Sequence, residues 1–263
     1  MSKKDNFQFI YQMEFNENQT DNNSKKMLVI TITWMGENQV FNLLKNLKNF
    51  SDKYKIQIKV FIIGFYDNKK AHIITYKIIN IFKSFARIKL DADMDILDID
   101  LFNNVLKASK KYGVTIYPVF DFIIKHKING VHFFHKNTEV NYNKLNSNFP
   151  DQYDVDNINI SNDVYFSHCN NPSKEQIRDF FAHRIRKAFR SNLFLMIQYM
   201  KVILKGIKNH PFIFIIHIPY FFFIFFKKEY KKTDNILECK NYLKKFLVQN
   251  DFKYSEYKKF ENY

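Results

Sequence analysis

Apolar segments of two kinds alternate along the first half of the chain, starting at Met27. One kind is short and rich in β-branched residues, as buried strands are; the other repeats apolar residues every three or four positions, as a helix with one buried face does. The expected strands are 27–33, 56–63, 85–90 and 114–119, and the expected helices are 37–50, 71–83 and 101–112. This order predicts an α/β fold in which helices cover a mostly parallel sheet.

The alternation ends after the fourth of these strands. Asn129-Gly130, between two apolar stretches, predicts a hairpin turn. Residues 137–163 are rich in Asn and Asp and predict a long surface loop. A last short strand is expected at 164–168, followed by a helix that begins after Ser173, a residue type that caps helix N-termini, and continues to Arg190.

Three regions follow from this pattern. Residues 1–26 are polar and predict a flexible tail without a secretory signal, residues 27–190 form the α/β domain, and residues 191–263 predict a helical C-terminal appendage. The apolar run 211–226 in that appendage is shorter than the roughly 20 residues of a membrane-crossing helix. Since lysines flank it, we expect segment 205–232 to lie in the plane of an anionic membrane surface, or alternatively to form a buried hairpin or core helix.

The charge of the chain is concentrated near its C-terminus. The formal net charge is +15, and residues 183–263 hold 17 Lys or Arg against 6 Asp or Glu. Such a charge suggests an anionic partner. A nucleic acid is not the expected one, because the aromatic residues gather in one apolar block instead of alternating with basic residues. Two distant cysteines, Cys169 and Cys239, predict neither a disulfide framework nor a zinc site, and suit the cytoplasm.

Two carboxylates follow the third strand directly, at Asp91 and Asp93. Ligands of open α/β sheets bind outside the carboxyl ends of the strands. A pair of carboxylates with this spacing suits a hard divalent cation such as Mg²⁺, which also binds phosphate oxygens. The alternative is a polar turn, in which Asp is common.

The order of these segments resembles the GT-A fold of nucleotide-sugar transferases, close to glycosyltransferase family 2. The resemblance covers residues 27–190 and rests on the opening strand Val-Ile-Thr-Ile-Thr-Trp (29–34) and on Lys-Leu-Asp-Ala-Asp-Met (89–94). It implies a nucleotide-sugar donor whose diphosphate is held by Mn²⁺ or Mg²⁺. It also implies a nucleotide pocket lined by Thr33, Trp34 and Glu37, with Asp91 on the ribose or sugar side and supporting the metal, and Asp93 as the main metal ligand.

The chain departs from this family after its second strand, where an acidic residue usually contacts the base. Here the sequence reads Gly64-Phe65-Tyr66-Asp67. Asp67 is the candidate for this contact, and Tyr66 is a candidate for stacking on the base. A solvated turn is the alternative for Asp67.

A second block, His168-x-x-x-Pro-Ser…Gln176…His183-Arg184…Lys187-Ala188, is similar to a segment of bacterial envelope-polysaccharide transferases. The resemblance makes His168 a candidate third metal ligand, although a histidine after a strand can also be structural. A helix N-terminus favours phosphate, and Arg184 and Lys187 are one turn apart, so they could bind a diphosphate or a lipid-phosphate acceptor.

An inverting transferase needs a carboxylate base that deprotonates the acceptor hydroxyl. Asp179 is the preferred candidate because Asp-Phe-Phe-Ala-His-Arg resembles the segment that follows this base in family 2, and Glu175 is the second candidate. Both could instead be solvated charges in the first turns of a helix.

The expected function is therefore a metal-dependent glycosyltransferase. It would move a sugar from a nucleotide-sugar donor to a glycan or lipid-linked acceptor in cell-surface polysaccharide synthesis, at the inner face of the cell membrane. The cation would neutralise the leaving nucleoside diphosphate. The alternatives are a non-catalytic partner subunit with the same fold and a basic nucleic-acid-binding protein.

Overall fold

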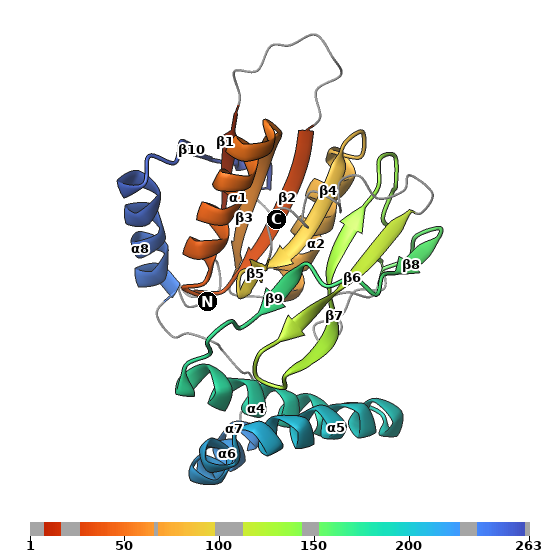
Figure 1. The fold of residues 1–263 in the computed structure, drawn as a ribbon, viewed down its shortest axis with the longest axis vertical. Helices are drawn as coiled ribbons and strands as arrows, with labels where there is room; N and C mark the ends of the chain where they lie inside the picture. Colours follow the sequence, from red (N-terminus) through yellow and green to blue (C-terminus); the bar gives the residue numbers. More distant parts are fainter. Residues whose placement is uncertain are drawn as a thin grey trace.

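The computed structural model describes residues 8–16, 27–65, 68–97, 113–143, 153–226 and 236–260, which form an α/β structure around one ten-stranded sheet (Figure 1). The strands are β1 (Gln8–Phe15), β2 (Met27–Trp34), β3 (Gln57–Phe65), β4 (Ala86–Asp91), β5 (Met94–Ile96), β6 (Val114–Asp121), β7 (His126–Phe134), β8 (Ile158–Ile160), β9 (Phe166–His168) and β10 (Tyr254–Glu256). The helices are α1 (Val40–Tyr54), α2 (Asn68–Ile81), α4 (Lys174–Phe189), α5 (Leu193–Asn209), α6 (Pro211–Ile216), α7 (Ile218–Phe226) and α8 (Ile236–Gln249), with a short 3₁₀ helix at Lys258–Phe260. The helix expected at 101–112 lies outside the described residues.

The sheet is mixed, so the expectation of a mostly parallel sheet is wrong. Its strand order is β10-β1-β3-β2-β4-β7-β6-β9-β5, with β8 beside β6. The pairs β2–β3, β2–β4, β6–β8 and β6–β9 are parallel, whereas the other five pairs are antiparallel. The main reason is the β6–β7 hairpin, which folds back and places β7 between β4 and β6.

This topology brings the carboxyl ends of several strands to one edge of the sheet. Because β7 is antiparallel to both of its neighbours, β4 and β6 run in the same direction. β2 is parallel to β4, and β9 is parallel to β6. The ends of β2, β4, β6 and β9 therefore meet at the edge where α/β sheets bind ligands.

The sequence predicted a hairpin turn at Asn129-Gly130, and this prediction is wrong. The chain turns at residues 122–125, and Gly130 lies within β7, where Tyr117 pairs with Val131 but Pro118 pairs with Asn129. Gly130 is the extra residue of this irregularity. A proline has no N–H to donate to the sheet, so a bulge opposite it avoids an unmade hydrogen bond.

We expect Gly130→Ala to lower the free energy of unfolding by about 1–3 kcal/mol, because it overpacks the bulge. A Cβ atom on Gly130 would lie 2.8 Å from Val119 Cγ1 and 3.2 Å from Met94 Cε. Urea unfolding would measure the loss, with Asn129→Ala on the exposed side of the same bulge as the control. Equal stability of Gly130→Ala and the unchanged chain would contradict this packing.

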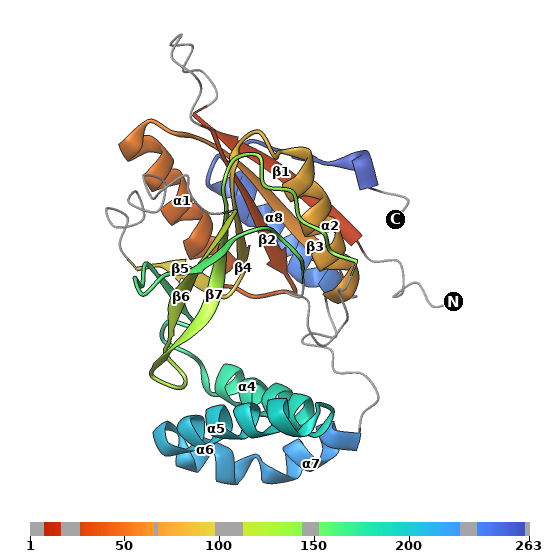
Figure 2. The same ribbon diagram turned by 90° about the vertical axis from the view of Figure 1, so that its right-hand side faces the viewer.

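Helices cover both faces of the sheet (Figures 1 and 2). α1 lies on one face and buries the apolar positions that its sequence pattern indicated: Val40, Leu43, Leu44, Leu47 and Phe50. α8 covers the same core and contacts α1 where the rings of Phe41 and Phe246 lie 4.4 Å apart. α2 packs on the opposite face, where its apolar side chains join Ile10, Val29, Phe61 and Ile63 in a separate cluster.

Both ends of the described chain belong to the sheet. β1 lies inside the expected flexible tail 1–26, yet it pairs with β3 along its whole length and with β10 on its other side. Leu243 and Leu247 of α8 are fully buried in the same core as β1. The expected appendage 191–263 is therefore divided, since α8 and β10 complete the sheet domain and only α5, α6 and α7 lie apart from it.

The helices α4 to α7 form a layer below the carboxyl ends of the strands (Figures 1 and 2). α4 begins where expected: Ser173 Oγ accepts a hydrogen bond from Gln176 N (3.2 Å), and Gln176 Oε1 accepts one from Ser173 N (2.8 Å). The layer is joined to the β6–β7 turn through the Ile123 carbonyl, which accepts from Asn209 Nδ2 at 3.3 Å. The run 211–226 forms two short helices interrupted at His217. None of the described helices combines the length and apolar character needed to cross a membrane.

Candidate metal centre

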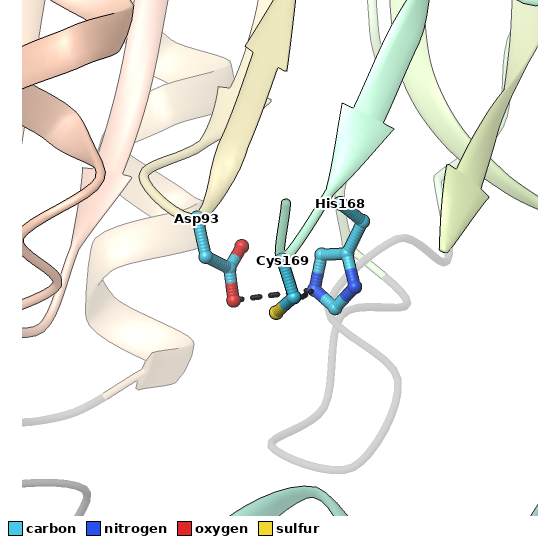
Figure 3. A group of neighbouring side chains, drawn as sticks. All are labelled: Asp93, His168 and Cys169. Carbon is cyan, nitrogen blue, oxygen red and sulfur yellow. Dashed lines mark hydrogen bonds and ion pairs between the residues drawn. The ribbon is translucent and has the colours of Figure 1, made fainter. Parts of the chain in front are cut away.

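Four polar side chains meet at the carboxyl ends of three strands. Asp93 lies in the turn between β4 and β5, Asp121 ends β6, and His168 ends β9, with Cys169 following it. Pairing between β5 and β9 brings the turn of Asp93 to the end of β9, and Cys169 N donates to the Asp93 carbonyl at 3.0 Å. Figure 3 shows the side chains of Asp93, His168 and Cys169 directed toward one another.

The imidazole of His168 bridges two carboxylates. Its Nδ1 lies 2.9 Å from Asp121 Oδ2, and its Nε2 lies 3.2 Å from Asp93 Oδ2. Asp121 is fully buried, and its other oxygen, Oδ1, accepts hydrogen bonds from Ile123 N (2.8 Å) and Ile124 N (3.1 Å). Asp121 is therefore fixed by the backbone and in turn fixes the ring of His168, with Nε2 facing Asp93. Histidines that bind metals are oriented in this way by an outer carboxylate.

The electrostatics of His168 are dominated by these neighbours. Burial by itself lowers the pKa of the imidazole, but the charge of Asp93 and the hydrogen bonds to Asp121 and Asp93 outweigh it and hold the pKa well above 6.5. In the chain alone, a proton on His168 compensates the two carboxylates. A cation at Nε2 would take the place of this proton.

The distances between the donor atoms fit ligands of one metal ion. The donor atoms of Asp93, His168 and Cys169 all lie within 4.8 Å of one another. In a tetrahedral site, a carboxylate oxygen and an imidazole nitrogen at about 2.0 Å from the metal are about 3.3 Å apart, compared with 3.2 Å between Asp93 Oδ2 and His168 Nε2. A thiolate and an imidazole in a tetrahedral site are about 3.6 Å apart, which matches the 3.6 Å between Cys169 Sγ and His168 Nε2.

The pKa of His168 predicts opposite effects of pH with and without metal. In chelator, a raised folded-state pKa contributes stability that is fully present below the unfolded pKa and is lost as the pH rises through the folded pKa. Metal binding instead requires neutral His168, so the apparent metal affinity should fall about tenfold per pH unit below that pKa. Melting temperatures measured against pH with EDTA and with Mn²⁺ would test this. Parallel profiles in the two conditions would contradict metal binding at His168.

Asp91 lies beside this group but is held by other residues. As the last residue of β4 it pairs with Thr33 of β2, and its Oδ1 accepts a hydrogen bond from Thr33 Oγ1 at 2.6 Å. Lys89 Nζ, which is buried, lies 3.6 Å from the same oxygen. Asp91 therefore faces β2, and it is not among the donor atoms that converge with those of Asp93 and His168.

The residues at the end of β2 shape the loop that follows. Trp34 Nε1 donates to the Glu37 carbonyl at 3.1 Å, and Glu37 Oε2 accepts from Met35 N at 2.7 Å. The Trp34 ring is buried against Phe9, with 5.5 Å between the ring centroids. The Trp34 indole is thus part of the hydrophobic core.

The candidates on α4 face its helical neighbours. Asp179 Oδ1 lies 2.9 Å from Arg178 Nη2 and accepts from the Tyr220 hydroxyl of α7 at 3.4 Å. The Arg184 guanidinium lies over the rings of Phe180 and Tyr199, at 5.4 and 5.9 Å.

Glu175 is exposed in the first turn of α4, and Lys187 is half-buried near the end of the helix. Hydrogen bonds from the backbone of Glu175 itself and from Ser173 lower the pKa of the Glu175 carboxyl. Asp67 lies outside the described residues.

Two residues of this centre were missed in the sequence. Asp121 lies just after the expected strand 114–119 and was not among the predicted site residues, and Cys169 was not expected to belong to a metal site. The signal for Asp121 was the same as for Asp93: a carboxylate directly after an apolar strand. Cys169 had no comparable signal, because its position depends on the pairing of β5 with β9.

Comparisons with known proteins identify no family. No protein-family model matches the chain, and no curated protein matches it. A solved structure described as "Crystal Structure of A197 from STIV" is 19% identical in sequence, covers 36% of this chain and 47% of its own, and has a TM-score of 0.27. The match spans about half of that protein and is too weak to carry an argument about fold or function.

Proposed function

We propose that the protein is a metal-dependent glycosyltransferase of GT-A type, which moves a sugar from a nucleotide-sugar donor to a glycan or lipid-linked acceptor. The observation that carries this proposal is the Asp121–His168–Asp93 arrangement, in which an oriented imidazole faces a carboxylate. It lies at the sheet edge where α/β proteins bind ligands. The resemblance of residues 29–34 and 89–94 to family 2 supports the same reading.

In this proposal Asp93 and His168 hold the cation, and Mn²⁺ or Mg²⁺ would supply positive charge beside the leaving nucleoside diphosphate. Asp121 keeps His168 in the orientation that exposes Nε2. Asp91, whose side chain is 41% exposed, offers a carboxylate to a ribose or sugar hydroxyl while Thr33 fixes one of its oxygens.

The acceptor hydroxyl would lose its proton to a carboxylate of α4. Asp179 stays the preferred base because of the resemblance of the segment that begins with it, and Glu175 stays the second candidate. The Asp179 side chain is 23% exposed and held by Arg178.

Cys169 adds a soft donor to this centre, and it should influence which metal binds. Thiolates favour Zn²⁺ over Mg²⁺ and Mn²⁺. We expect Cys169→Ser to weaken Zn²⁺ binding at least about tenfold, while Mn²⁺ binding changes little. Isothermal titration with both metals would measure this, and Co²⁺ loading would show a thiolate charge-transfer absorption only in the unchanged chain. Equal Zn²⁺ affinity of both proteins would mean that Asp93 and His168 act without the sulfur.

A screen of nucleotides tests the proposed function. The full chain is mixed with nucleoside diphosphates and nucleotide sugars, with Mn²⁺ or with EDTA, and its melting temperature and the release of nucleoside diphosphate are measured. We expect at least one nucleotide to raise the melting temperature only when Mn²⁺ is present. If metal binds but no nucleotide has an effect, the transferase proposal is overturned and only the metal centre remains.

A further inference from the structure

The helices α5, α6 and α7 leave many large apolar side chains exposed. Phe212 is 78% exposed, Ile216 71% and Phe194 69%. The full set comprises Leu193, Phe194, Ile197, Met200 and Leu204 on α5, Phe212, Ile215 and Ile216 on α6, and Ile218, Phe222 and Phe223 on α7. We call this set the apolar surface of the helical layer. Exposed apolar patches of this kind mark interaction sites on folded proteins.

This surface is not a consequence of loose packing. The same helices bury a second set of side chains against α4, including Ile203 and Phe221. Gly206 of α5 is so close to α4 that a Cβ atom there would lie 2.8 Å from the Phe181 ring. α5 thus has one apolar side packed on α4 and a second one, at Leu193, Ile197 and Leu204, that is exposed.

The charge around this surface has one sign. Residues 180–226 contain seven Lys or Arg and no Asp or Glu. Lys201, Lys205 and Lys208 of α5 are all exposed. A second copy of the chain would bring cations against cations, so self-association through this face is disfavoured. An anionic surface is complementary to it.

We propose that the apolar surface of the helical layer binds an anionic lipid bilayer, with α5, α6 and α7 lying in the plane of the interface. Helices with apolar residues on one side and lysines beside them bind in this way, by burying apolar area and by attracting anionic lipids. α6 and α7, of six and nine residues, are too short to cross a bilayer but can lie in its interface. Figure 2 shows them on the side of the helical layer that is farthest from the sheet.

This inference goes beyond the proposed function and does not depend on it. It also gives the metal centre a fixed position relative to the bilayer, because α4 begins at Lys174, shortly after His168, which ends β9, and Cys169, which follows it. The candidate centre would then lie on the side of the sheet that faces the bilayer, with the helical layer between them.

Flotation of the full chain with vesicles tests the proposal. Vesicles of phosphatidylcholine alone are compared with vesicles that also contain phosphatidylglycerol, at low and high salt. We expect binding to the anionic vesicles and its weakening by salt. The double variant Phe212→Ser with Phe222→Ser should bind at least about tenfold less, since two large apolar side chains no longer enter the interface.

The matched control is Ile158→Ser with Ile160→Ser, which changes two exposed apolar residues of β8, far from the helical layer in sequence. It should bind as the unchanged chain does. Melting temperatures of all variants establish that they are folded. The proposal is overturned if the folded chain does not bind anionic vesicles, or if the Phe212/Phe222 variant binds them equally well. It is also overturned if light scattering shows that the unchanged chain is a dimer and the Phe212/Phe222 variant a monomer, because a second copy of the chain would then cover this surface.

Discussion

Replacing Asp93 with asparagine is expected to weaken metal binding to this chain severely. The amide keeps the shape of the side chain but removes the negative charge that faces His168 Nε2 at 3.2 Å. Loss of an outer-shell partner typically costs 10–100-fold in metal affinity. Loss of a charged ligand should cost more, so we expect a decrease of roughly 100-fold or greater.

Titration calorimetry with Mn²⁺ and Zn²⁺ would measure this decrease, together with any metal-dependent hydrolysis of nucleotide sugars. Asp163→Asn is the control, because this exposed aspartate contacts only its close neighbours Ser161 and Tyr165 among the hydrogen bonds described. Asp93→Asn should lose both binding and hydrolysis, and Asp163→Asn neither. Unchanged metal affinity in Asp93→Asn would remove Asp93 from the centre and with it the basis of the proposed function.

Replacing Asp121 with asparagine is expected to have two separate effects. Asp121 is fully buried and accepts three hydrogen bonds, two from backbone N–H groups and one that involves His168. An amide nitrogen in place of Oδ1 would place its N–H groups against the backbone N–H groups, and in place of Oδ2 against Nδ1 of His168. A buried group left without its partner costs about 2–4 kcal/mol of the free energy of unfolding. The ring of His168 would also lose its orientation, so metal affinity should fall about 10–100-fold.

The two effects can be measured independently. Urea unfolding in EDTA gives the stability, and metal titration well below the melting temperature gives the affinity of the folded variant. Asp156→Asn, which changes an exposed carboxylate, is the control for both. If Asp121→Asn is destabilised but keeps its metal affinity, Asp121 supports the fold alone and does not position His168.

Much of this centre could be predicted from the sequence, because its parts are local. Asp93 and His168 each follow an apolar strand, and Ser173 followed by Gln176 indicates the start of α4. The amphipathic pattern of α1 likewise predicted which of its residues are buried. These signals depend on neighbours within a few positions, so they can be recognised in the sequence without knowledge of the fold.

What could not be predicted depends on pairing between distant segments. The antiparallel insertion of β7 between β4 and β6 cannot be read from the order of strands, and Asn129-Gly130 has the composition of a turn although it forms a bulge. β1 is isolated within polar sequence, so nothing nearby marks it as part of the sheet. The resulting errors concern the same region that supplies Asp121.

The pairing of β1 with β10 has a consequence for biosynthesis. β1 lies near the start of the described chain and β10 near its end, with Leu243 and Leu247 of α8 filling the core beneath them. The N-terminal part of a chain leaves the ribosome first, so β1 and the apolar face that α8 covers stay without these partners until residues 236–256 have been made. During that interval an unpaired strand edge is available to other chains. We therefore expect nascent chains that end before α8 to depend on chaperones, and full-length chains to be released from them.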